Sequence, residues 1–126
     1  MTDIVYRELS YKLNGIAFTI FKELGPGLRE KIYADAFEIA LKDAGISYKR
    51  EIRYPVFFKG KKITYQSLDL LVDDKIVIEL KSGEREYFEA FDQLLNYLKL
   101  SKLKLGLIIR FTKKGAVIRR IVNLDK

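Results

Sequence analysis

The chain has 126 residues and a formal net charge of +7, and it contains neither cysteine nor histidine. These absences exclude disulfide frameworks, thiolate nucleophiles, zinc fingers, Ser-His-Asp triads and histidine-based nucleases. Any catalysis must therefore use Asp, Glu, Lys, Arg, Tyr, Ser or Gln. The length predicts one domain over residues 1–126. Because we recognise neither a signal peptide nor an apolar run of membrane-spanning length, we expect a cytoplasmic protein.

The pattern of apolar residues predicts three helices and five strands. Apolar side chains recur at three- and four-residue steps, as in amphipathic helices, over residues 3–24, 28–44 and 84–100. The expected strands are residues 47–58, 63–72, 76–81, 104–111 and 116–122. The resulting order, ααβββαββ, predicts helices packed on a mixed sheet.

A predicted hairpin over residues 69–81 carries charged side chains on otherwise apolar strands. Such charges are costly to bury unless they are paired or bound to a metal. Glu79 and Lys81 share one face of their strand because they are two residues apart. Asp69 is expected to lie on the strand face opposite Leu68, Leu70 and Val72.

The length of the hairpin loop decides whether the two acids meet. A two-residue loop, Asp73-Asp74, would place Asp69 and Glu79 on opposite faces of the sheet. A three-residue loop that includes residue 75 instead pairs residue 72 with residue 76, and Asp69 with Glu79. We predict the second register, because it buries both apolar sets together and because three-residue loops are common in hairpins.

Two carboxylates beside an ammonium group suit a Mg²⁺ site. Mg²⁺ prefers oxygen ligands and needs only one or two carboxylates plus a substrate phosphate; Mn²⁺ suits the same oxygen ligands. Lys81 would neutralise a phosphate or orient a water molecule for attack. The alternative is an ion pair without a catalytic role, which joins Lys81 to Glu79 or to Asp69.

Three polar residues on the expected helices are further candidates. Glu30 lies in the first turn of the second helix, where it either complements the helix dipole or reaches over the acidic patch. Gln93 and Tyr97 are four residues apart and share a helix face. They form an ordinary polar helix edge, or Gln93 binds a phosphate while Tyr97 lines a groove or stacks on a base.

The net charge suits a polyanionic partner, nucleic acid above all. Basic residues cluster near expected turns at Lys59, Lys61, Lys62, Lys99, Lys102, Lys104, Lys113 and Lys114. Each of them by itself is explained as solvated surface, but together they could track a phosphate backbone.

The run Gly27-Leu28-Arg29-Glu30-Lys31-Ile32-Tyr33 matches the pattern for which the GxxExxY family is named. The hairpin Asp69…Glu79-Leu80-Lys81 and the stretch from Asp92 to Leu98 also resemble that family, in the same order and over nearly the whole chain. GxxExxY proteins are grouped with the PD-(D/E)XK nuclease superfamily. The resemblance implies a restriction-endonuclease-like fold, a three-layer α/β/α sandwich around a mixed, mainly antiparallel sheet. The chain departs from the motif at Leu68, where proline is usual.

The resemblance also implies a metal-dependent catalytic set of Glu30, Asp69, Glu79 and Lys81. Asp69 and Glu79 would hold the metal, with the carbonyl of Leu80 as a third ligand. Glu30 would bind a second metal ion or a water on the metal, and Lys81 would orient the attacking water.

The remaining expectations concern substrate and partners. Gln93 and Tyr97 match the QxxxY element of RecB-type members, which implies that they position the substrate. The expected activity is Mg²⁺-dependent hydrolysis of phosphodiester bonds in DNA. The alternatives are an RNA-directed nuclease and a non-catalytic module that binds nucleic acid or protein; a homo-oligomer is compatible with each.

Overall fold

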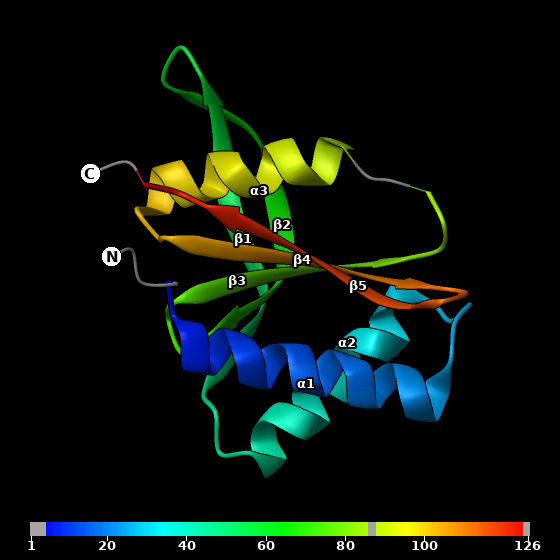
Figure 1. Cartoon of the computed structure of the whole chain (residues 1–126). Helices are drawn as coiled ribbons and strands as arrows, with labels where there is room; N and C mark the ends of the chain where they lie inside the picture. The colour runs from blue at the N-terminus through cyan, green and yellow to red at the C-terminus, as the bar shows by residue number, and fades with distance from the viewer. Residues whose placement is uncertain (1–4, 86–87, 125–126) are drawn as a thin grey trace.

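The computed structural model describes residues 5–85 and 88–124. The helices and strands follow the predicted order ααβββαββ (Figure 1). They are α1 (Arg7–Leu24), α2 (Glu30–Asp43), β1 (Tyr48–Phe58), β2 (Lys61–Val72), β3 (Ile76–Ser82), α3 (Phe88–Ser101), β4 (Leu105–Thr112) and β5 (Gly115–Val122). Within the described ranges, no helix is both long enough and apolar enough to cross a membrane.

The five strands form one sheet in the order β1-β2-β3-β4-β5. Strands β3 and β4 are parallel, because α3 intervenes and carries the chain back across the sheet. The other three neighbouring pairs are antiparallel. The sheet is therefore mixed and mainly antiparallel, as predicted.

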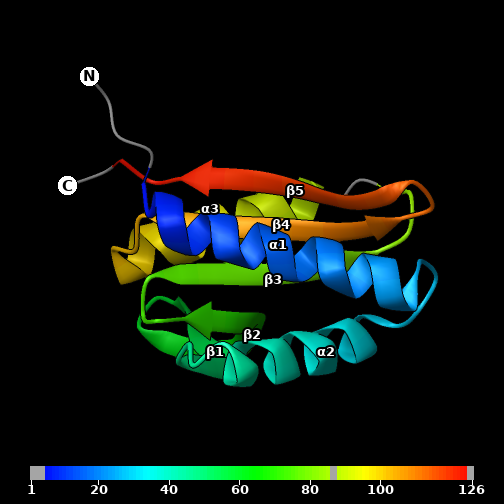
Figure 2. The ribbon, with the colours of Figure 1, turned by 60° about the horizontal axis from the view of Figure 1, so that its bottom comes forward.

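The helices cover both faces of the sheet, so the fold has three layers (Figure 2). Helices α1 and α2 lie on one face and α3 lies on the other. Strand β3 shows why this works: Ile76 and Ile78 pack in the core under α1 and α2, whereas Val77 packs in the core under α3. Side chains that alternate along a strand thus serve two separate apolar cores. The predicted three-layer sandwich is confirmed.

Each helix starts later than the sequence pattern suggests. Helix α1 begins at Arg7, after Tyr6 takes a left-handed conformation with φ of 50°; the expected residues 3 and 4 lie outside the described residues. Helix α3 begins at Phe88. Glu84 is not helical, because its carboxylate accepts the backbone N–H of Lys113 at 3.0 Å across the sheet end. Residues 86 and 87 of that expected helix also lie outside the described residues.

Strand β2 departs from the predicted pattern of faces at its middle. Leu70 packs in the core under α1 and α2, but Leu68 packs in the core under α3. The expectation that these two residues share a face is therefore wrong. The break lies beside Glu51 of β1, which has a positive φ of 55°, and no ladder pair joins Glu51 to Asp69. A positive φ at a residue other than glycine is unfavourable and marks a local distortion of the strand.

Candidate active site where β2 and β3 part

The β2–β3 hairpin has the register that brings the two acids together. Val72 pairs with Ile76 and Leu70 pairs with Ile78, across the three-residue loop of residues 73–75. The backbone N–H of Lys75 donates to the carbonyl of Val72 at 2.9 Å and closes this loop. The predicted register is confirmed for these pairs, but the expected Asp69–Glu79 pair is not part of the ladder. The ladder ends at the Leu70–Ile78 pair, and the strands part where the charged residues begin.

Asp69 takes over the hydrogen bonding that the parted strands give up. Its Oδ2 accepts the backbone N–H of Leu80 at 2.6 Å. Its own backbone N–H donates to Oε1 of Glu79 at 3.2 Å. The side chains of Asp69 and Glu79 therefore lie together in the gap between β2 and β3.

Glu79 is the most strongly perturbed acid of this site. Its side chain is buried, and burial together with the adjacent Asp69 carboxyl raises the pKa of Glu79 to about 8. Lys81 opposes the shift from the same face of β3, with its Nζ 3.7 Å from Oε2 of Glu79. A buried acid beside a partly buried one, next to a cation, is typical of catalytic sites, although ion-pair networks also perturb pKa values.

Glu30 reaches the same end of β3 from the other layer. It stands in the first turn of α2, and its Oε2 accepts the backbone N–H of Ser82 at 3.2 Å. The residue that Glu30 bonds, Ser82, directly follows Lys81 in β3. However, no three His, Cys, Asp or Glu side chains in the described part of the chain are close enough to share a metal ion. Asp69 and Glu79 consequently form a pair, and Glu30 stands apart from it.

Tyr33 explains how the loop before α2 places Glu30. Its ring is fully buried and stacks on Phe111 with ring centres 3.9 Å apart. Its hydroxyl donates to the carbonyl of Gly25 at 2.7 Å and accepts the backbone N–H of Leu28 at 3.3 Å. These bonds hold the chain in a loop beyond the expected helix start at Leu28, so α2 begins at Glu30.

Gln93 and Tyr97 face the sheet from α3 but bind protein groups. Gln93 Nε2 donates to the carbonyl of Ser67, two residues before Asp69, at 3.2 Å. The ring of Tyr97 lies 5.0 Å from the ring of Tyr54 in β1. Both residues therefore border the site, and both fix the part of the β1–β2 hairpin that leads into it.

Sequence reasoning missed Tyr54, which contacts Tyr97 and is close enough to Glu79 to be influenced by its charge. It is buried, and its hydroxyl donates to Oε1 of Gln66. Burial foremost raises the pKa of Tyr54, and the negative charge of Glu79 raises it further. One tyrosine in a strand that also holds Tyr48, Phe57 and Phe58 gives no signal that could have singled it out.

Arg110 was missed as well, although the sequence did carry a signal. It pairs in register with Lys81 across the parallel β3–β4 ladder, so the two cations stand side by side. Its guanidinium donates to the carbonyl of Glu84 at 2.7 Å and holds the segment after β3. A charge within an apolar strand is the feature that singled out Asp69 and Glu79, and it marks Arg110 in the same way.

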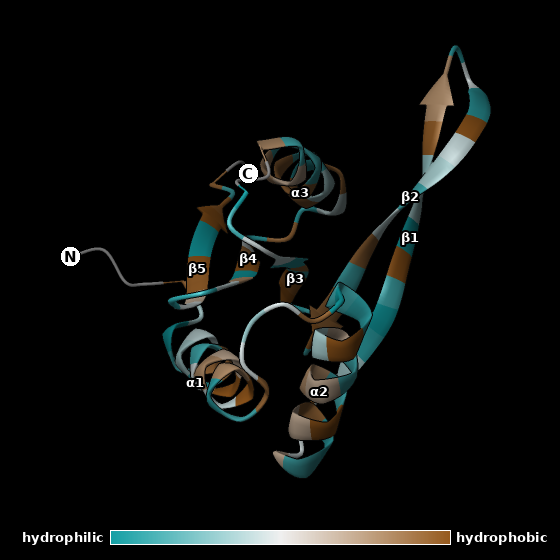
Figure 3. Ribbon diagram, turned by 90° about the vertical axis from the view of Figure 1, so that its right-hand side faces the viewer, coloured by the Kyte–Doolittle hydropathy of each residue, from teal (hydrophilic) through white to brown (hydrophobic). Residues whose placement is uncertain are grey.

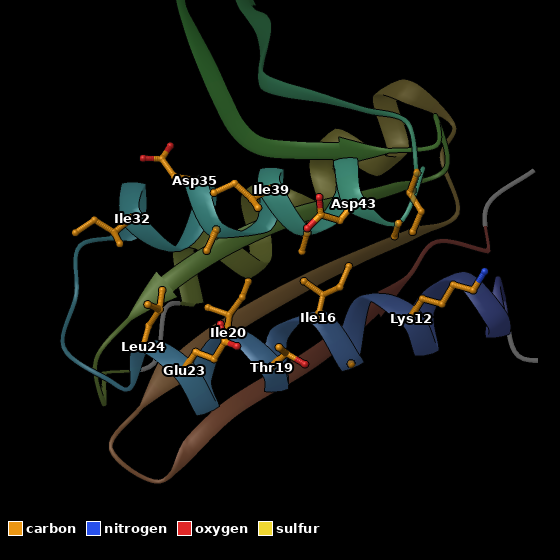
Figure 4. A pocket seen from close by; sticks show the side chains of 15 residues that line it. Lys12, Ile16, Thr19, Ile20, Glu23, Leu24, Ile32, Asp35, Ile39 and Asp43 are labelled. Atoms are coloured by element: carbon orange, nitrogen blue, oxygen red, sulfur yellow. The ribbon is translucent and has the colours of Figure 1, made fainter.

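A groove lies between α1 and α2, away from the acid pair (Figure 4). It is an open groove of about 870 Å³, and Ile16, Ile20 and Ile39 point into it. Volume alone would favour this groove as a binding site. The acidic pair does not line it, and its lining is mainly aliphatic. The chemistry therefore points to the gap between β2 and β3.

Comparison with known proteins agrees with the geometry. A family model described as the PD-(D/E)XK nuclease superfamily matches residues 7–121. A solved structure titled "Crystal structure of SSO0001" is similar, with a TM-score of 0.57 and 21% sequence identity, over 96% of this chain and 59% of that chain. At that identity the likeness bears on the fold alone, and this chain spans 59% of the other. Among curated proteins there is no match. The narrower resemblance to the GxxExxY family stays a prediction.

Proposed function

This chain belongs to the PD-(D/E)XK nuclease superfamily, and we propose that it hydrolyses phosphodiester bonds of DNA with the help of Mg²⁺. One observation carries the proposal. The carboxyl groups of Asp69 and Glu79 lie together where β2 and β3 part, with the ammonium group of Lys81 3.7 Å from Glu79. An acid pair with a neighbouring cation has the composition that phosphodiester hydrolysis requires.

The donor set fits a hard divalent cation. The side chains that meet offer only oxygen atoms, which suits Mg²⁺ or Mn²⁺ better than Zn²⁺. The raised pKa of Glu79 supports the same reading, because burial and the adjacent Asp69 carboxyl outweigh the Lys81 ammonium group, so a further positive charge would help Glu79 to ionise. Asp69 and Glu79 would hold the ion, with the carbonyl of Leu80 as a third ligand.

Each residue then has a separate task. A bound divalent cation would supply positive charge for the phosphate and lower the pKa of a water molecule. Lys81 would orient the attacking water and stabilise negative charge that develops on the phosphate. Glu30 is separated from the acid pair, so we assign it to a second ion or to a water molecule at the end of β3.

Gln93 and Tyr97 would act on the substrate indirectly. Their contacts with Ser67 and Tyr54 hold the β1–β2 hairpin against α3. We propose that they set the direction from which a strand reaches Asp69, rather than contact its phosphate.

A non-catalytic nucleic-acid-binding module is the second candidate. Two features favour it: the acid pair is already hydrogen-bonded by backbone groups, and no third acid joins it in the described chain. Salt dependence of binding does not separate the candidates, because both use Lys and Arg against phosphate.

Strand scission separates them. Wild type, Asp69→Asn and the surface control Asp43→Ala would be compared at matched salt, with Mg²⁺ and with chelator. The substrates would be single-stranded, duplex and branched DNA, and RNA. The nuclease proposal expects Mg²⁺-dependent scission of DNA by wild type and the control, and binding without scission by Asp69→Asn. Scission of RNA alone would assign the site to RNA. Binding by all three proteins without scission of any substrate would leave the non-catalytic module.

A further inference from the structure

The outer part of the β1–β2 hairpin projects from the body of the protein past α3 (Figures 1 and 3). We refer to residues 53–67 as the arm. All of its β2 residues from 61 to 67 are exposed. An isolated two-stranded hairpin is marginally stable in water. The arm therefore gains little from packing along most of its length, which directs attention to what its side chains offer a partner.

The arm combines exposed rings with uncompensated positive charge. Its exposed apolar side chains are Phe57, Phe58, Ile63 and Tyr65, each more than half exposed. Its cations are Arg53, Lys59, Lys61 and Lys62, and no acidic residue occurs from residue 52 to residue 68. Lysines alone would be explained as protection of an exposed strand edge. Exposed aromatic rings promote the association that such lysines prevent, so the presence of both rings and lysines needs another explanation.

Rings and cations on the arm are also neighbours. The Nζ of Lys62 lies 4.2 Å from the centre of the Tyr65 ring, and that of Lys59 lies 5.5 Å from the centre of the Phe58 ring. A ligand with a flat ring and a nearby negative charge could contact an aromatic ring and a lysine of the arm at the same time. Nucleotides have that composition, because each base carries an adjoining phosphate.

A hollow at the base of the arm adds a place for a ring. It is about 340 Å³ in volume and lies between the arm and α3. Tyr54, Pro55 and Phe57 line it from the arm, and Tyr97 and Leu100 line it from α3. Concave, mainly apolar sites of this volume hold small organic groups.

The hollow is fixed in relation to the acid pair. Gln93 donates to Ser67, and the chain reaches Asp69 two residues later. Tyr54 lies in the wall of the hollow and close enough to Glu79 to be influenced by its charge. A strand seated along the arm and in the hollow would consequently run toward the gap between β2 and β3.

We propose that the arm and the hollow at its base bind an unpaired stretch of nucleic acid. Its bases stack on Phe57 and neighbouring rings, and its phosphates lie along Lys59, Lys61 and Lys62. A duplex hides its base faces in its own stack, so the rings select unpaired nucleotides. This inference names the substrate class of the proposed nuclease and rests on that proposal for cleavage, but binding can be measured without it.

Fluorescence anisotropy in chelator tests the rings. The probes are a labelled oligothymidylate and a duplex of equal length. Phe57→Ala should weaken binding of the single strand by about 5- to 150-fold, the scale of one lost base–ring stack, and leave duplex binding little changed. Phe18→Ala removes a comparably exposed ring from α1 and should change neither. Equal loss for both probes, or no loss for the single strand, would overturn the proposal.

Salt titration tests the cations. Replacing Lys59, Lys61 and Lys62 together by Gln should reduce the slope of log K against log salt by about 2 for the single strand. The control replaces three exposed lysines of α1 and α2, namely Lys12, Lys22 and Lys31, and should leave the slope unchanged. An unchanged slope in the arm variant would refute the assignment.

The two proposals fail in different ways. If wild type binds the single strand through Phe57 and the lysines but never cuts it with Mg²⁺, the arm stands and the nuclease proposal falls. If wild type cuts DNA and the arm variants bind the single strand as wild type does, the arm proposal falls and the nuclease stands.

Discussion

The backbone N–H of Leu80 donates to the carboxylate of Asp69 at 2.6 Å. Beyond the Leu70–Ile78 pair the β2–β3 ladder stops, so no β2 backbone group pairs with Leu80 in that ladder. The carboxylate of Asp69 therefore accepts the hydrogen bond from Leu80 that a backbone carbonyl of β2 would accept in a continuous ladder. The Asp69 side chain thus has two roles: it accepts the hydrogen bond from Leu80 and it lies against Glu79. A substitution at Asp69 therefore affects both the stability of the sheet and the proposed chemistry.

That double role predicts different outcomes for two substitutions at one position. Asp69→Asn keeps an oxygen acceptor for Leu80 and should change the free energy of unfolding little. Asp69→Ala leaves a donor without a partner and should cost about 1–3 kcal/mol. Urea unfolding measures both. Equal stability of the two variants would show that the bond to Leu80 contributes nothing to folding.

Asp69→Asn and Asp69→Ala should differ in stability but not in metal binding. Both lose a carboxylate of the proposed site, so both should lose Mn²⁺ binding in calorimetry. Asp43→Ala removes an exposed acid of α2 and should retain wild-type affinity. Retention of Mn²⁺ affinity by Asp69→Asn would remove Asp69 from the ligand set.

The raised pKa of Glu79 predicts how stability changes with pH in chelator. Because the folded pKa lies above the ordinary value of 4.5, at about 8, the folded state holds a proton that the unfolded state releases. The stabilisation is complete below pH 4.5 and is lost as pH rises through 8, by up to about 1.4 kcal/mol per unit. Glu79→Gln stays neutral and should lack this loss, so it should exceed wild type in stability at pH 9.

Thermal melts from pH 4.5 to pH 9 would check this window. Mg²⁺ should restore part of the stability that wild type loses at high pH and leave Glu79→Gln unaffected, since binding to the folded state stabilises it. Parallel pH curves for wild type and variant would contradict the raised pKa.

Lys81 should matter for cleavage more than for the metal. If it acts on water or phosphate, Lys81→Ala should slow single-turnover cleavage by roughly 10²-fold or more. Mn²⁺ affinity should hold or increase, because a cation 3.7 Å from Glu79 has been removed. Lys12→Ala, an exposed lysine of α1, is the matched control. Loss of Mn²⁺ affinity in step with cleavage would favour a purely structural ion pair.

Most of the fold could be predicted because its patterns are local. The spacing of apolar residues located every predicted helix and strand to within a few residues. The alternation of side chains on β3, together with a three-residue loop, predicted the register of the hairpin. That register also predicts that Asp69 and Glu79 meet, and their side chains do lie together although the ladder ends one pair before them. These inferences need only side-chain spacing and the cost of burying charge, both of which are written in consecutive residues.

What could not be predicted depends on groups distant in sequence. The reversal of Leu68 between the two cores follows a distortion at Glu51, in the neighbouring strand. The later start of α2 follows the hydroxyl of Tyr33, which bonds Leu28 and Gly25, five and eight residues away in sequence. The contact of Gln93 with Ser67 likewise depends on how α3 crosses the sheet. No local pattern encodes these relationships.

Tyr33 provides a test of how the GxxExxY-like segment acts. Tyr33→Phe keeps the stack on Phe111 but removes the hydroxyl that bonds Gly25 and Leu28. The variant should lose about 1–3 kcal/mol of stability, because two partly buried backbone groups lose their partner. Amide exchange should rise at residue 25 and at residues 27–29, where the loop is released. If that loop places Glu30, cleavage should fall while Mn²⁺ affinity at the Asp69–Glu79 pair stays at the wild-type level.

The matched control is Tyr11→Phe, which removes a hydroxyl from an exposed tyrosine of α1 and should change neither stability nor exchange. Glu30→Gln provides the comparison on the acid itself: it keeps an acceptor for Ser82 but loses the charge. A positioning role for Tyr33 requires its variant to reproduce the cleavage defect of Glu30→Gln in milder form and to add the faster exchange that Glu30→Gln lacks. Faster exchange without any loss of cleavage would show that the loop stabilises the fold but that Glu30 does not depend on it.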